Sequence, residues 1–199
     1  MRIIATEGSR RFTAKFVAAK IGVTAGAIYR HFAGMDAIID AVIDRVEALL
    51  FAGFPPNAGD PFARLGLFFQ RRVETIASNP DISRMLLSDH LAHAAGPRRA
   101  VRIEGFKRRS RRFVVECLRQ AEEDGSLKRS VRPEEGAIVV LGSILTLAHA
   151  NPRVARKTSV TVLSERVWSV LERALRRPGP AGCGSRRRPR MRGRVARVV

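Results

Sequence analysis

The spacing of apolar residues along the chain predicts helices throughout and supports no β-sheet. Apolar residues recur every three to four positions in each long segment, which is the period of a helix with one buried face. No run of alternating apolar and polar residues is long enough to indicate a strand. The expected helices are a short one before residue 8 and the segments 13–21, 24–32, 36–53, 61–78, 82–93, 98–124, 133–150 and 158–177. The sequence therefore predicts an all-α fold of about nine helices.

Residues 13–32 are the most informative stretch, because a tight turn there separates two short helices. Thr13 and Thr24 are expected N-caps, since a threonine hydroxyl can accept a hydrogen bond from an unpaired N–H of the first turn. Gly22 is expected to end the first helix, because glycine adopts the left-handed conformation at the least steric cost. The apolar residues are Val17, Ala18 and Ile21 in the first helix, with Ile28 and Phe32 turned inward in the second. The arrangement matches a helix-turn-helix, although a helical hairpin inside an unrelated all-α domain would show the same pattern.

The second helix of this unit has the features needed to enter a DNA major groove. It begins with the small residues Ala25 and Gly26, and a slim N-terminal end can approach base edges in a groove about 12 Å wide. Tyr29, Arg30 and His31 follow, and they offer donors to phosphate oxygens or to base edges. The chain up to this point contains six Lys or Arg against one acidic residue, which is the sign of charge that a phosphate backbone requires.

The same stretch resembles the helix-turn-helix of TetR-type transcriptional regulators. The sequence GVTAGAIYRHF is followed by MDAIIDAV. The matching features are the Gly22-Val23-Thr24 turn, Gly26, the Tyr29 and Phe32 pair, and the acidic Asp36 at the start of the next helix. The motif covers about a quarter of the chain, and in this combination it is rather specific. The resemblance implies a DNA-binding regulator.

Three features depart from that family pattern. Met35 stands where members usually carry a Lys that contacts a phosphate, and Phe16 stands where a polar residue is usual. The first helix is expected to be little more than a turn, because only Arg2 to Glu7 precede Gly8. That helix normally covers the core of the helix-turn-helix in the family, so a sensor with an impaired DNA reader is an alternative.

The resemblance also implies which side chains face the DNA and how the chain divides. The residues expected near bases are Thr24, Ala25, Gly26 and Arg30, and those expected on phosphates are Thr13, Lys20, Tyr29 and His31. The expected parts are a helix-turn-helix DNA-binding domain at 1–45, an effector-binding and dimerisation domain at 46–177, and a disordered basic tail at 178–199.

The last two predicted helices are the expected dimer interface. Both carry broad apolar faces, and TetR-like proteins pair through these helices as a four-helix bundle. The face residues are Ala137, Val140, Leu141, Ile144, Leu145 and Ala148, then Val160, Leu163, Val167, Val170 and Leu171 with Trp168 beside them, and Gly142 and Ser143 permit close approach. The same periodicity is also expected of helices that belong to the protein's own core.

By resemblance, an effector pocket is expected between the fifth, seventh and eighth helices. Its aromatic and aliphatic lining favours a hydrophobic small molecule. The candidate lining residues are Phe69, Ile76, Met85, Leu86, Phe106, Phe113, Cys117 and Leu145, each of which also fits an ordinary core position. His90 and His93 lie one turn apart beside Asp89, but no further cluster of ligands accompanies them, so no metal site is predicted.

Composition favours a nucleic-acid partner and excludes several other classes. The formal net charge is +19, from 37 Lys and Arg against 18 Asp and Glu, and nine of the Arg lie between residue 176 and residue 199. No nucleophile elbow, phosphate-binding Gly-rich loop, HExxH or paired-Cys motif is present, so we expect neither an enzyme nor a cofactor. The two cysteines make no disulfide framework. No signal peptide is evident and the longest apolar run spans about fourteen residues, so we expect a cytoplasmic protein without a membrane partner.

The expected function is transcriptional regulation: a ligand-released repressor that binds a palindromic operator in double-stranded DNA as a homodimer. A non-specific, charge-driven nucleic-acid-binding protein is the main alternative. The sequence identifies neither the effector nor the operator.

Overall fold

The described part of the chain is helical, as the apolar spacing predicts. The computed structural model describes residues 13–82, 89–148 and 159–178. Its helices are α2 (Ala14–Ile21), α3 (Ala25–His31), α4 (Met35–Leu50), α5 (Pro61–Ser78), α7 (Asp89–Glu123), α8 (Pro133–Ala148) and α10 (Val160–Leu175). The all-α class is confirmed. The expected first helix lies outside the described residues, as do residues 83–88 of the segment 82–93. No described helix combines the length and the hydrophobicity that a bilayer crossing requires.

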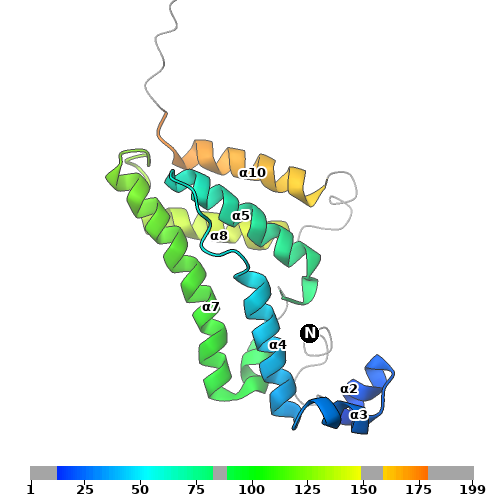
Figure 1. Cartoon of the computed structure of the whole chain (residues 1–199). Helices are drawn as coiled ribbons and strands as arrows, with labels where there is room; N and C mark the ends of the chain where they lie inside the picture. The colour runs from blue at the N-terminus through cyan, green and yellow to red at the C-terminus, as the bar shows by residue number, and fades with distance from the viewer. Residues whose placement is uncertain (1–12, 83–88, 149–158, 179–199) are drawn as a thin grey trace, which may run out of the picture.

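Figure 1 shows a small unit at one end of the molecule and a stack of helices at the other. The small unit contains α2 and α3, and the stack contains α5, α8 and α10. The long helix α7 and the helix α4 run between the two ends and lie side by side. The helix α4 therefore connects the small unit to the rest of the protein.

The predicted break near residue 96 is a kink inside one long element. Gly96 has φ 76° and ψ 166°, and Pro97 follows it inside α7. A positive φ suits glycine, and proline cannot donate the backbone hydrogen bond that a continuous helix would need there. The two residues therefore redirect the helix, and Figure 1 shows α7 turning back beside α4 at this end.

The apolar side chains form two separate clusters that meet within α4. The small cluster contains Val17 and Ala18 of α2, Ile28 of α3 and Ile38 of α4. The neighbouring residue Ile39 belongs to the main core, which is built around α5. Each large side chain fully buried in that core contributes about 1.5–3 kcal/mol to folding. The predicted domain boundary at residue 45 stays a prediction. The two apolar clusters meet at residues 38 and 39 of α4.

Much of the apolar surface expected at a dimer interface lies instead in this core. Ala137, Val140 and Ile144 of α8 are buried, as are Trp168 and Leu171 of α10. The helix α8 packs against α5 and α7, and α10 packs against α5. The apolar faces that the periodicity predicts are therefore buried inside the protein itself. The expectation that these five residues form a surface for a second subunit was therefore wrong, although other residues of the same helices are exposed and apolar.

The end of α10 is fixed to the loop after α7. The backbone N–H of Lys128 donates to the Leu175 carbonyl at 2.9 Å, and the N–H of Arg177 donates to the Ser126 carbonyl at 2.7 Å. Arg176 also forms a salt bridge with Asp60 at 3.2 Å. These contacts fix the C-terminal end of α10 to the loop between α7 and α8 and to the N-terminal end of α5.

Candidate nucleic-acid interface and effector cavity

The local structure of the helix-turn-helix follows the expected caps. The Thr13 hydroxyl accepts a hydrogen bond from the Phe16 N–H at 3.2 Å, and the Thr24 hydroxyl accepts one from the Ala27 N–H at 3.2 Å. Gly22 ends α2 with φ 74° and ψ 30°, which is the left-handed conformation. These three predictions are confirmed. Ile21 was wrongly placed on the apolar face: it is 57% exposed at the last position of α2, where the chain turns away.

The helix α3 presents its polar side to solvent and its apolar side to α2. Ile28 is buried against Val17 and Ala18 of α2 in the small cluster, whereas Tyr29 and Arg30 are exposed. The remaining expected contact residues lie on the same unit: Thr13, Lys20, Thr24, Gly26 and His31 are exposed, and Ala25 is half-buried. The unit is therefore shaped and charged for a major groove, and the individual DNA contacts stay predictions.

Two arginines of α7 hold α4 along its acidic side, and we refer to these contacts as the α4–α7 clamp. Arg99 binds Asp40 through Nε at 2.6 Å and through Nη2 at 2.8 Å, and its Nη1 lies 2.9 Å from Asp36. The hydrogen bond from Arg99 holds the pKa of Asp40 below its usual value. Arg102 binds Asp44 at 2.7 Å and Glu47 at 2.5 Å. The hydrogen bonds that Arg102 donates to these two carboxylates, Glu47 first, raise the pKa of Arg102.

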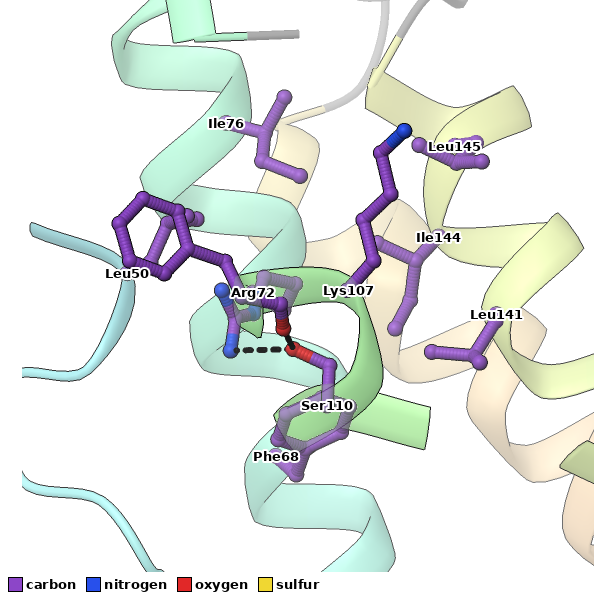
Figure 2. Close-up of a pocket in the computed structure, with 10 residues that line it drawn as sticks. Leu50, Phe68, Arg72, Ile76, Lys107, Ser110, Leu141, Ile144 and Leu145 are labelled. Carbon is purple, nitrogen blue, oxygen red and sulfur yellow. Dashed lines mark hydrogen bonds between the residues drawn. The ribbon is translucent and has the colours of Figure 1, made fainter. Parts of the chain in front are cut away.

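A cavity of about 350 Å³ lies between the end of α4 and the helices α5, α7 and α8. Its lining residues are Leu50, Phe68, Arg72, Ile76, Phe106, Lys107, Ser110, Leu141, Ile144 and Leu145. Figure 2 shows the side chains from the different helices converging on one space, with Arg72 directed at Ser110. The volume lies within the range of small-molecule sites, and the lining is mostly apolar with a few polar groups, as in such sites.

The candidate effector residues divide into three groups in the structure. Ile76, Phe106 and Leu145 line the cavity. Phe69, Phe113 and Cys117 lie in or against the main core and outside that lining. Met85 and Leu86 lie outside the described residues.

Several lining residues were not predicted from the sequence, although one of them, Arg72, has a recognisable sequence signal. Arg72 lies four positions after Phe68 and four before Ile76, so it falls within the apolar stripe of α5. A charged residue at a buried helix position is uncommon without a partner and marks a candidate site. The other missed residues, such as Leu50 and Leu141, have no such signal because any buried helix contains them.

Metal binding gains no support from the described residues. They contain no group of three or more His, Cys, Asp or Glu side chains that could hold an ion. The side chains of His90 and His93 lie outside the part that the structure describes.

Comparison with known proteins relates the chain to bacterial regulators. Residues 1–42 match the family model described as "Bacterial regulatory proteins, tetR family". The nucleoid occlusion factor SlmA of Pasteurella multocida is 26% identical over 173 residues, which are 83% of this chain and 84% of that protein.

Solved structures share the fold at low sequence identity. The ketosteroid transcriptional regulator KstR2 of Mycobacterium tuberculosis is 18% identical with a TM-score of 0.69, covering 89% of this chain and 91% of that one. The regulator FadR from Bacillus subtilis, in complex with stearoyl-CoA, is 15% identical with a TM-score of 0.61, covering 85% of this chain and 92% of that one. The helix-turn-helix with its caps and the family match over residues 1–42 identify this part of the chain as the DNA-binding unit of the TetR family of bacterial regulators, and the described helices share the fold of the solved regulators.

Proposed function

We propose that the protein is a cytoplasmic repressor that binds a palindromic operator as a homodimer and is released by a small molecule. The main support is that the same two helices, α4 and α7, both line the cavity and form the α4–α7 clamp. Phe106, Lys107 and Ser110 line the cavity, and Arg99 and Arg102 of the same helix bind α4.

Occupancy of the cavity is expected to act on α4 from two sides. Leu50, the last residue of α4, belongs to the cavity lining, so a ligand would touch that helix directly. A ligand that displaced α7 would also pull α4 through Arg99 and Arg102. Since α4 carries Ile38 of the small cluster, its movement would reposition the helix-turn-helix. A ligand shifts such an equilibrium only by its difference in affinity for the two positions.

Dimerisation is supported by apolar residues left exposed on α8 and α10. Ile138 is 65% exposed and Val170 is 56% exposed, and Val139 and Val162 are also exposed. Gly142 has no atom within 4 Å of an added Cβ, so a neighbouring helix can approach α8 closely there. A helix-turn-helix dimer reads two half-sites about one helical turn apart, about 34–36 Å.

DNA binding by the purified full-length protein tests the proposal. The protein and a version ending at Arg177 are titrated with the DNA upstream of its own gene and with random duplex, at two salt concentrations. Preference for the upstream DNA that survives removal of the tail is the expected result. Arg30→Ala should weaken that preference, whereas Arg45→Ala, an equal charge change on the exposed side of α4, should leave the preference largely intact.

A second candidate is a nucleoid-associated role without an effector. It is favoured by the net charge of +19 and by the similarity to SlmA, which is named as a nucleoid occlusion factor. A protein that relies on charge alone would bind both DNA molecules nearly equally, with steep salt dependence. That outcome would refute the operator-specific proposal.

A further inference from the structure

The cavity contains a buried positive charge that none of the acidic side chains described by the structure neutralises. Arg72 is only 7% exposed. Its guanidinium donates a hydrogen bond from Nη2 to the Ser110 hydroxyl at 3.3 Å. Among the described side chains, those of residues 13–82, 96–147 and 159–178, no salt bridge joins Arg72 to a carboxylate. Burying a charge without an opposite charge is costly, so the position invites an anionic partner.

The surroundings of Arg72 add further positive charge. Its guanidinium carbon lies 5.0 Å from the ring centroid of Phe51 and 5.1 Å from that of Phe68. Arg109 lies 4.2 Å above the same Phe51 ring. Burial, together with the charge of Arg109, lowers the pKa of Arg72 to about 10. An anion beside the guanidinium would offset both the cost of burying its charge and the repulsion from Arg109.

A guanidinium that lies over aromatic rings can still donate hydrogen bonds from its N–H groups. Cation–π contacts use the ring face, whereas the N–H donors lie in the guanidinium plane and suit a two-oxygen acceptor. Ser110 contributes a hydroxyl whose own donor goes to the Phe106 carbonyl at 3.0 Å. Lys107, also in the lining, pairs with Glu104 at 3.3 Å, so among the residues that the structure describes Arg72 is the lining cation that has no acidic partner.

The rest of the lining is suited to an apolar chain. Leu141, Ile144 and Leu145 of α8 face the space that Arg72 and Ser110 enter from α5 and α7 (Figure 2). At about 30 Å³ for each water-sized group, a cavity of about 350 Å³ holds about twelve non-hydrogen atoms. A medium-length alkyl chain with a small head group has this size.

We propose that the effector is a medium-chain amphiphile with one anionic head group, a carboxylate or a phosphate, bound by the Arg72 guanidinium. The apolar chain lies against the α8 wall formed by Leu141, Ile144 and Leu145. The inference rests on the proposed function for the regulatory consequence of binding, but the binding itself is independent of DNA.

Titration calorimetry on the full-length protein tests this assignment with three probes. Decanoate and decyl phosphate carry the two head groups, and 1-decanol is the neutral control, with the anions below their critical micelle concentrations and the alcohol below its solubility limit. We expect the anions to bind at least about tenfold more tightly than 1-decanol, because a hydrogen bond to a charged group contributes about 1.5–3 kcal/mol. The stronger of the two anions identifies the head group.

Two neighbouring arginines of α5 provide the matched variants. Arg72→Gln should reduce the ratio of decanoate to 1-decanol affinity to about one. Arg71→Gln makes the same charge change on the exposed side, where Arg71 donates to the Gly53 carbonyl at 3.0 Å, and should preserve the ratio. The comparison of probes on the unmodified protein needs no variant, so a poorly folded Arg72→Gln would not prevent the test.

The outcomes separate the ligand assignment from the regulatory proposal. Equal affinity for decanoate and 1-decanol, unchanged by Arg72→Gln, would show that Arg72 is a structural cation and overturn the inference. Failure of every probe to bind a protein that still prefers its own upstream DNA would also overturn the inference and leave the regulator intact. Anion binding through Arg72 that leaves upstream DNA binding unchanged would support the ligand class and refute release by the ligand.

Discussion

Replacing Gly66 with alanine tests a close contact between two helices of the core. Gly66 lies in α5 against Trp168 of α10, and an added Cβ would lie 2.7 Å from Nε1 and 3.0 Å from Cε2 of the indole. Ordinary contacts between carbon atoms are about 3.5–4.0 Å, so the overlap is about 1 Å. Trp168 is buried and its ring packs on Phe69 at 5.6 Å between centroids, so it cannot move without disturbing the core.

The size of the effect follows from two opposing contributions. Overpacking a core costs about 1–3 kcal/mol, and alanine in place of glycine inside a helix regains about 1 kcal/mol. Because two atoms of a confined ring overlap with the new methyl group, we expect a net loss of about 1–2 kcal/mol. In a chain of about this length each kcal/mol shifts Tm by about 2–4 °C, so Tm should fall by about 2–8 °C.

Circular dichroism during thermal and urea unfolding measures this change at one fixed protein concentration. Gly105→Ala is the matched control, because no atom lies within 4 Å of an added Cβ in the middle of α7, and it should gain up to about 1 kcal/mol. In a Trp168→Phe background the loss caused by Gly66→Ala should shrink, because the nearest atom is removed. Equal losses in the two backgrounds, or no loss at all, would refute the steric explanation.

Four further predictions concern the surface, the clamp and a buried thiol. Ile138→Glu places a carboxylate on the exposed apolar side of α8 and should convert dimer to monomer in analytical ultracentrifugation; an unchanged dimer would locate the interface elsewhere. Arg99→Ala should weaken the response of DNA binding to an effector, and a normal response would exclude the clamp from the coupling. Because the pKa of Asp40 is lowered from 3.8, its ion pair stabilises the fold above about pH 4 and is lost as the pH falls further, so the acid unfolding curves of the protein and of Arg99→Ala should converge at low pH. Burial raises the pKa of Cys117 from 9.0 to about 11, so in a Cys183→Ser variant its alkylation at pH 8 should be about a hundredfold slower than for a free thiol, and rapid labelling would contradict that burial.

The helix-turn-helix could be predicted in detail because local interactions determine it. The caps at Thr13 and Thr24 each join residues three positions apart, and the turn at Gly22 depends on the conformation of one residue. Such features are encoded within a few neighbouring positions. The bounds of α5 were also predicted, since Asp60 caps the helix and Pro61 occupies a first-turn position.

The cavity and the dimer surface depend on contacts between distant segments. Apolar residues occur around much of α8, so periodicity alone cannot distinguish its side toward the core from its side toward a partner. Val140 is fully buried, whereas its neighbour Val139 is exposed. Ser110 gained a role only because α7 brings it within 3.3 Å of Arg72, which lies 38 positions earlier. No local pattern contains that information.

The change of cluster between Ile38 and Ile39 has a geometric consequence for the operator. Both residues lie in one continuous helix of 16 residues, about 24 Å long, so the helix has no internal joint at the change. A displacement of about 1–2 Å at Leu50 would therefore tilt the whole of α4 by about 2–5° about its far end. In the proposed homodimer the two α4 helices would tilt in opposite directions. A displacement smaller than one methyl group would then alter the spacing of two recognition helices that have to match the fixed helical repeat of DNA.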